Sequence, residues 1–430
     1  MPRLVVRPVQ QFMHQEAAGG VVLLAATLAA LVWANVDGAG YASLWETSVT
    51  VTVSDWTVAE DLRHVVNDGL MALFFFVIGL EVKRELVVGE LQDRRAAALP
   101  AFAAVGGMVV PALVFLAVTA GGEGGEGWGI PIATDVAFAL GALAALGRRV
   151  PPALVAFLLG VAVIDDIGAI LVIALFYSDP PALGWLAAAG AGLAAIALLN
   201  RIHVRHIGVY VVLGLGVWLA TFESGLHATL AGVALGLLTP ARPFQSPSAV
   251  SSEAYRIADV TPDDPEGADA DASHWRRLSW LSKEAISPLN RLEHGTHQWS
   301  SFVVLPIFAL ANAGIVLDRE GLEGAAENGV AAAVAAGLVL GKVAGLTGGV
   351  LLALRLRLAR LPQGVSLRQV VGVGGLAGIG FTVSLFIAGL AYPDDPDLLS
   401  AARIGILGGS AIAAVLGVAL LLAATRRRDA

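Results

Sequence analysis

Five ionisable side chains lie within long apolar stretches of the sequence. Asp68, Asp135 and Lys342 each lie in a different stretch, and Asp165 and Asp166 are neighbours in another. A charged residue at the centre of a bilayer costs about 2.5–3.5 kcal/mol on insertion scales, so such residues are usually paired or functional. A membrane-edge charge or a structural ion pair explains a single one of them. The adjacent pair is harder to explain in this way, because it lies in the middle of its stretch.

The adjacent carboxylates predict a site at which cations are exchanged. Successive residues on a helix point about 100° apart, so one aspartate faces a cavity while the other turns to a neighbour, for which Lys342 is the natural candidate. The sequence leaves open which of Asp165 and Asp166 faces the cavity. Two close carboxylates in a low dielectric resist double ionisation, and Na⁺ needs deprotonated oxygen ligands. Protons and Na⁺ therefore compete for the same oxygens, as coupled exchange requires.

The composition places most of the chain in an apolar solvent. Hydrophobic residues make up 57% of the 430, and charged residues only 14%, against about a quarter in soluble globular chains. The mean hydropathy is +0.75. Cysteine is absent, which excludes disulfides, thiolate catalysis and zinc–sulfur sites.

Apolar runs long enough to span a bilayer, about 20 residues each, predict an all-α polytopic membrane protein with about twelve transmembrane helices. The predicted spans are 17–36, 62–82, 96–120, 128–147, 151–177, 181–199, 206–222, 224–240, 298–317, 329–354, 369–392 and 398–425. With the N-terminus inside, all but four of the 27 lysines and arginines fall in inside segments; the exceptions are Arg63, Arg319, Lys342 and Arg403. The positive-inside rule then predicts a cell inner (plasma) membrane protein with both termini in the cytoplasm.

Spans three to five and spans ten to twelve predict a pair of inverted repeats. The two units run in opposite directions, and the middle span of each is interrupted: span four by Gly129 to Asp135, and span eleven by five glycines between 372 and 380. Paired discontinuous helices are typical of secondary transporters, where the freed backbone groups line a central site. Glycine-mediated packing explains span eleven alone, but not its correspondence with span four. We expect Asp135 to offset facing helix N-termini and Lys342 to offset facing C-termini.

Two segments outside the spans are distinctive within what we expect to be a single membrane domain over residues 1–430. Residues 243–277 carry several aspartates among Pro, Ser, Gly and Ala, which predicts a disordered cytoplasmic insertion. Thr47 to Trp56 alternate Thr and Val, which predicts a short external β-strand or hairpin. An exposed strand can pair with its copy in a second protomer; a hairpin folded on its own surface explains the pattern equally well.

The order of several motifs resembles the NhaA-type sodium/proton antiporters over nearly the whole chain outside 243–277. These motifs are RHVVNDGL at 63–70, GLEVKREL at 79–86, ATDVAFAL at 133–140, IDDIGA at 164–169, LHATLAG at 226–232, GK at 341–342 and GIGFT at 378–382. The resemblance implies an electrogenic, alkaline-activated antiporter that exports Na⁺ or Li⁺ for protons in sodium and pH homeostasis. It implies a homodimer formed through an external hairpin, with no cofactor and no nucleic-acid partner.

The resemblance also implies roles for individual residues. Asp166 matches the aspartate that binds Na⁺ and protons, and Asp165 matches its partner in proton handling, which pairs with the lysine at Lys342. The ion-binding and transport residues are Asp68, Thr134, Asp135, Asp165, Asp166 and Lys342. The residues that match a pH sensor are Glu81, Arg84, Glu85, Glu293, His294 and His297.

Three other functions could use buried charges in a membrane. An intramembrane aspartyl protease needs two aspartates that face each other from separate helices, whereas Asp165 and Asp166 are neighbours. An organic-anion carrier needs arginine or exposed helix N-termini in its site, which an acidic pocket does not offer. A passive channel does not need an aspartate pair beside a lysine. The sequence therefore favours coupled cation exchange by a transporter over any enzyme.

Overall fold

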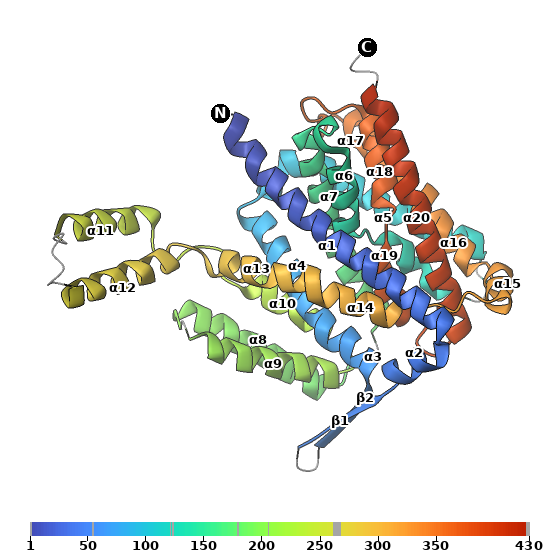
Figure 1. Cartoon of the computed structure of the whole chain (residues 1–430), viewed down its shortest axis with the longest axis horizontal. Coiled ribbons are helices and arrows are strands. Elements are labelled where there is room, and N and C mark those ends of the chain that lie inside the picture. Colours follow the sequence, from blue (N-terminus) through green and yellow to red (C-terminus); the bar gives the residue numbers. More distant parts are fainter. Residues whose placement is uncertain are drawn as a thin grey trace.

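The computed structural model describes residues 2–53, 56–120, 122, 124–178, 180–204, 206–260 and 268–426, which are mostly helical (Figure 1). The elements in chain order are α1 Pro2–Val36, α2 Gly38–Trp45, β1 Ser48–Val53, β2 Trp56–Asp61, α3 Leu62–His64, η1 Val65–Leu70, α4 Met71–Val87, η2 Glu90–Gln92, α5 Arg94–Thr119, η3 Gly125–Ile132, α6 Val136–Leu146, η4 Gly147–Arg149, α7 Pro152–Phe176, α8 Leu183–Arg201, α9 Ile207–Glu223, α10 Thr229–Leu238, α11 Pro247–Val260, α12 Ala268–Glu284, α13 Pro288–Trp299, η6 Ser300–Val304, α14 Leu305–Asn312, α15 Arg319–Glu327, α16 Val330–Ala336, η7 Gly337–Gly341, α17 Lys342–Arg355, α18 Leu367–Ala377, α19 Phe381–Ala391 and α20 Pro396–Arg426.

The described residues include eight helical stretches that are long and apolar enough to cross a membrane. They correspond to predicted spans one to six, ten and twelve. The α18–α19 pair, bent by 47° at its break, passes the same test as a ninth and corresponds to span eleven. Where spans seven and eight are predicted, the structure has the shorter apolar helices α9 and α10. Where span nine is predicted, it has the end of α13, the π-helical turn η6 and α14. The chain is therefore a multi-pass membrane protein.

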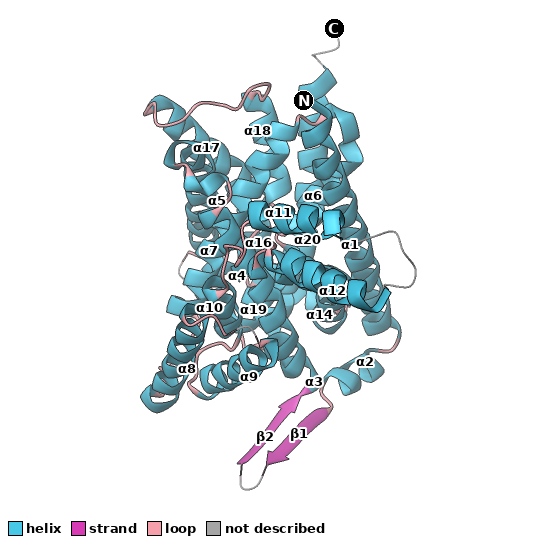
Figure 2. Cartoon of the chain, turned by 90° about the vertical axis from the view of Figure 1, so that its left-hand side faces the viewer, coloured by secondary structure: helices cyan, strands magenta, loops and turns pink. Residues whose placement is uncertain are grey.

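A β-hairpin projects from one end of the helical bundle. The start of α1 and the end of α20 lie at the opposite end of the molecule (Figure 2). Strand β1 pairs antiparallel with β2, from Ser48 opposite Asp61 to Val53 opposite Trp56. The hairpin expected over 47–56 is confirmed, and its second strand runs on to residue 61. The acidic Glu60 and Asp61 hide that strand in the sequence, because they interrupt the apolar alternation.

Small residues allow the core helices to approach each other closely. In lipid the hydrophobic effect contributes little to the association of helices, so close van der Waals packing of their backbones stabilises it instead. Helices α5 and α17 show this at Gly349, where an added Cβ would collide with the carbonyl oxygen of Phe102. Helices α18 and α20 meet in the same way at Gly375 and Gly417.

Two three-helix units carry the broken helices. The first contains α5, η3 with α6, and α7; the second contains α16–η7–α17, α18 with α19, and α20. The first unit is broken at residues 133–135 and the second at residues 378–380. The predicted discontinuities in spans four and eleven are therefore confirmed, and they place backbone groups without helical partners inside the bundle.

The segment 243–277 contains helix where we expected a disordered insertion. Helices α11 and α12 extend away from the bundle (Figure 1), and Arg277 Nε of α12 lies 3.1 Å from Glu253 Oε1 of α11. The backbone amides of Phe244 and Gln245 donate to the carbonyl oxygen of Glu284 and close the base of the segment. The alanines and arginines of these two helices favour helix. Its acidic centre, residues 261–267, lies outside the described residues.

Candidate ion-binding site

The two broken helices cross at their breaks. The backbone amide of Asp135 donates to the carbonyl oxygen of Ile379 at 2.6 Å. The hydroxyl of Thr134 lies 2.8 Å from the carbonyl oxygen of Ala377. Both Thr134 and Asp135 are buried. Each break thus supplies hydrogen-bond partners for the backbone groups that the other break frees, as a membrane interior requires.

Lys342 occupies the carbonyl end of η3. Its side chain is 0% exposed, and it begins α17 directly after the π-helical turn η7. Nζ donates to the carbonyl oxygen of Ile132 at 2.6 Å, to Thr134 Oγ1 at 2.9 Å and to Asp165 Oδ2 at 2.6 Å. One ammonium group therefore neutralises both a helix C-terminus and a buried carboxylate. The expectation that Lys342 offsets a facing C-terminus is confirmed.

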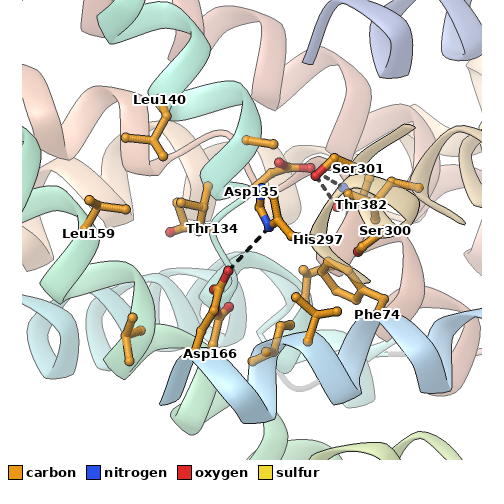
Figure 3. A pocket seen from close by; sticks show the side chains of 18 of the residues that line it. Phe74, Thr134, Asp135, Leu140, Leu159, Asp166, His297, Ser300, Ser301 and Thr382 are labelled. Carbon is orange, nitrogen blue, oxygen red and sulfur yellow. Dashed lines mark hydrogen bonds and ion pairs between the residues drawn. The ribbon is translucent and has the colours of Figure 1, made fainter. Parts of the chain in front are cut away.

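Asp135 occupies the opposite kind of helix end. Oδ1 accepts from the backbone amide of Phe138, at the start of its own helix α6. Oδ2 accepts from the backbone amide and the hydroxyl of Thr382, at 3.2 Å and 2.6 Å, at the start of α19 (Figure 3). One carboxylate thus caps the N-termini of both broken helices, as expected from the partial positive charge of a helix N-terminus.

Helix α7 directs its two aspartates differently. Asp165, 2% exposed, bonds to Lys342, and its Oδ2 also lies 2.7 Å from the Thr134 hydroxyl. Its other oxygen, Oδ1, is buried without a hydrogen-bond partner in the described part of the chain. Asp166 lines the cavity described next. The question that the sequence left open is thereby answered, because Asp166 faces the cavity and Asp165 turns to the lysine.

The cavity has a volume of about 110 Å³ and lies beside the crossing of the two breaks. Its lining includes Thr134, Asp135, Asp166 and Thr382, whose side chains carry oxygen atoms, together with apolar residues and further polar and charged ones (Figure 3). Water occupies about 30 Å³ per molecule in the liquid, so the space fits a small cation with few waters. Carboxylate and hydroxyl oxygens are hard ligands of the kind that such a cation prefers.

Four of the six residues that match the sensor also line this cavity. They are Glu81, Arg84, Glu85 and His297. Arg84 pairs with the buried Glu293 of α13 and lies 3.3 Å from Glu85. His297 Nδ1 lies 3.8 Å from Glu81 Oε1. The network joins α4 to α13 directly at the cavity.

Two candidate residues lie elsewhere. His294 is exposed, and its Nδ1 lies 2.9 Å from the carbonyl oxygen of Asn290 on its own helix. Asp68 lies on the π-helical turn η1 with its carboxylate 2.7 Å from His64 Nε2. Neither is among the residues that line the cavity. The structure therefore separates these two from the other predicted site residues.

Two tyrosine hydroxyls form hydrogen bonds with the backbone at the start of η3, which is the end remote from α6. Tyr177 OH donates to the carbonyl oxygen of Glu126 at 2.7 Å and accepts from the amide of Gly129 at 3.0 Å. Tyr392 OH donates to the carbonyl oxygen of Gly124 at 2.6 Å. Neither tyrosine was predicted from the sequence as part of the site. Their one signal is position, since each follows directly on an apolar helix.

Discontinuous helices that cross at a buried ionisable site define a secondary transporter of the inverted-repeat kind. The family model described as Na⁺/H⁺ antiporter 1 matches residues 10–421. The Na⁺/H⁺ antiporter NhaA of Rhodopirellula baltica is 46% identical over 419 residues, covering 97% of this chain and 94% of the relative. The Na⁺/H⁺ antiporter NhaA of Anaeromyxobacter sp. is 46% identical over 432 residues, covering 98% and 92%. The Na⁺/H⁺ antiporter NhaA 2 of Myxococcus xanthus is 44% identical over 425 residues, covering 98% and 90%.

The chain belongs to the Na⁺/H⁺ antiporter 1 family. The resemblance that the motifs indicate is confirmed over almost the whole length. The family's members are transporters, so the aspartyl-protease alternative is set aside. The structure agrees with this, because Asp165 bonds to Lys342 and the two aspartates project from one helix.

Proposed function

We propose that the chain exchanges Na⁺ for protons and that Asp166 binds either ion. The observation that carries the proposal is a carboxylate lining a small cavity at the crossing of two broken helices. The relatives named Na⁺/H⁺ antiporters match the chain across nearly its whole length, which supports the same pair of substrates here. Li⁺, which is smaller than Na⁺ and takes the same oxygen ligands, is the expected alternative cation.

Mutual exclusion at Asp166 provides the coupling. Na⁺ requires the ionised carboxylate, and a proton on that carboxylate removes both its charge and a ligand oxygen. Asp165 turns from the cavity to Lys342, and its other oxygen, Oδ1, is buried without a partner in the described part of the chain, which leaves it free to accept a second proton. Because both carboxylates can carry protons, more protons than sodium ions cross in each cycle, and the exchange is electrogenic.

The cavity determines which side of the membrane the site faces. Arg84, Glu85 and His297 line it, and the distribution of lysine and arginine favours a cytoplasmic position for this end of α4 and for both termini. The structure then corresponds to a conformation open to the cytoplasm in the inner membrane. The tyrosine hydroxyls at η3 close the opposite route, and outward release requires their bonds to break.

Charges at the mouth of this cavity provide the pH response. The Arg84–Glu293 pair and the His297–Glu81 contact connect α4 with α13. Histidine changes its charge in the physiological pH range, so His297 alters the balance of this network as the pH changes. Alkaline activation follows when loss of a proton releases α13 from α4.

A homodimer is the proposed assembly. The hairpin formed by β1 and β2 projects from the bundle (Figure 2), and a two-stranded sheet leaves an outer edge on each strand. Unpaired edges bind further strands readily, and a second copy of the hairpin is the partner of matching length. The dimer would be held outside the bilayer while the helices meet lipid.

Transport in reconstituted vesicles tests the proposal. With an acid interior, Na⁺ and Li⁺ added outside should dissipate the pH gradient between about pH 6 and about pH 9. Asp166→Asn should abolish this exchange. Asp318→Asn is the matched control, because Asp318 caps the exposed helix α15 and asparagine caps equally well. If no cation moves protons at any pH in that range, the proposal fails and an organic-anion carrier becomes the function to test.

A further inference from the structure

A second hollow lies between the start of α18 and the end of α20. It has a volume of about 350 Å³ and is lined by Arg368, Val371, Leu420, Ala423 and Ala424. The two helix ends lie next to each other near the C-terminus in both views (Figures 1 and 2). The hollow is thus an apolar groove with a single cation at one of its ends.

The groove lies at the level where a spanning helix leaves the bilayer. Helix α20 is apolar over Pro396–Thr425, and three consecutive arginines follow from position 426. The residues of α20 that line the groove belong to its last two turns. Arg368 is exposed at the second position of α18. An arginine at this depth places its guanidinium among the lipid headgroups, while its stem and its apolar neighbours meet acyl chains.

Positive charge predominates along the part of the chain that leads into α18. The sequence between Glu327 and Asp394 contains no acidic residue. Four exposed arginines lie at the end of α17, in the loop that follows it and at the start of α18. They are Arg355, Arg357, Arg360 and Arg368. None of the four makes an ion pair with another described residue. A cluster of this kind attracts anionic lipid, at about 1 kcal/mol for each basic side chain near the surface.

We propose that the groove binds an anionic phospholipid. One acyl chain lies along Val371, Leu420, Ala423 and Ala424, and the phosphate lies against Arg368. The guanidinium fork matches a phosphate with two parallel hydrogen bonds. The apolar lining selects a lipid over a soluble anion, which would leave those four side chains uncovered.

Lipid in this position would stabilise the second three-helix unit. Helices α18 and α20 pack closely at Gly375 and Gly417, and α18 leads directly into the break that contacts Asp135. The lipid bridges the outer ends of the same two helices. We therefore expect it to raise the melting temperature and leave the Na⁺ dependence of transport unchanged.

Lipid binding to the purified full-length protein in detergent tests this proposal. Phosphatidylglycerol and phosphatidylcholine are titrated separately, and bound lipid is counted by native mass spectrometry while the melting temperature is recorded. Phosphatidylglycerol should bind and stabilise, and phosphatidylcholine should do so only weakly. Arg368→Gln should weaken phosphatidylglycerol binding about fivefold, the factor that corresponds to about 1 kcal/mol.

Two further variants separate a built site from general surface charge. Arg360→Gln removes an equal charge outside the groove and should weaken phosphatidylglycerol binding clearly less than Arg368→Gln does. Ala424→Phe fills the groove, keeps Arg368, and should lose the stabilisation. Equal binding of the two lipids, equal losses in the two arginine variants, or full stabilisation of Ala424→Phe would each overturn the proposal. Sodium transport is not the readout, so the antiport proposal stands or fails separately.

Discussion

Removal of the Lys342 ammonium group should strongly destabilise the protein unless Asp165 is neutralised with it. Lys342 is 0% exposed and donates three hydrogen bonds, to Asp165, Thr134 and the carbonyl oxygen of Ile132. In Lys342→Met the carboxylate of Asp165 loses its counter-charge within a low dielectric. Breaking a buried ion pair on one side costs about 3–5 kcal/mol, so we expect a loss of that size.

The double variant Lys342→Met/Asp165→Asn should recover most of this loss. It leaves no buried charge at the pair, and replacing both partners of a buried pair is often close to neutral. The free energy of unfolding is measured by SDS titration in mixed micelles for the wild type, both single variants and the double variant. The two changes should be strongly non-additive. A loss below about 1 kcal/mol in Lys342→Met, or strict additivity, would refute the view that this is a tightly coupled buried pair.

Other contacts in the structure lead to four more predictions. Thr382→Val removes the hydroxyl that donates to Asp135 and should cost about 1.5–3 kcal/mol, the range for a bond to a charged group; Thr382→Ser should keep most of it in the same SDS assay. Tyr177→Phe removes the two hydrogen bonds that the Tyr177 hydroxyl makes with η3 and should speed hydrogen exchange at residues 126–129. Unchanged exchange there would show that this hydroxyl does not stabilise η3. Gly349→Val should abolish monodisperse protein on size exclusion because of its close approach to α5, whereas Gly348→Val, with nothing within 4 Å, should be tolerated. The apparent KM for Na⁺ should rise as the pH falls, by up to about tenfold per unit, because protons occupy the same carboxylate; a pH-independent KM in vesicles would exclude competition at one site.

The broken helices and the buried charges were predictable because both are costly in lipid. The glycine and proline interruption at 129–135 and the glycine run at 372–380 weaken helix inside apolar spans, where freed backbone groups are tolerated only around a buried site. Asp165, Asp166 and Lys342 are similarly conspicuous, because their insertion cost identifies them without any structure. The structure confirms that these features meet at one place.

The finer geometry was not predictable from the sequence. Which of two adjacent aspartates faces the cavity depends on the rotation of α7 about its axis, and packing decides that rotation. The hydroxyls of Thr382 and Tyr177 carry no charge, so their burial leaves no signal in hydropathy. Asp68 has the same signal as Asp135, yet it pairs with His64 away from the cavity.

The crossing of the two breaks also imposes an order on biosynthesis. The carbonyl oxygens of Ile130 and Ile132 emerge early, but their partners Ser384 and Lys342 lie 254 and 210 residues further along the chain. Until those partners are synthesised, the first unit stands in the bilayer with an uncapped helix end, which is costly in lipid. The candidate ion-binding site is therefore assembled late, and translation must pass α19 before the first broken helix has all its partners.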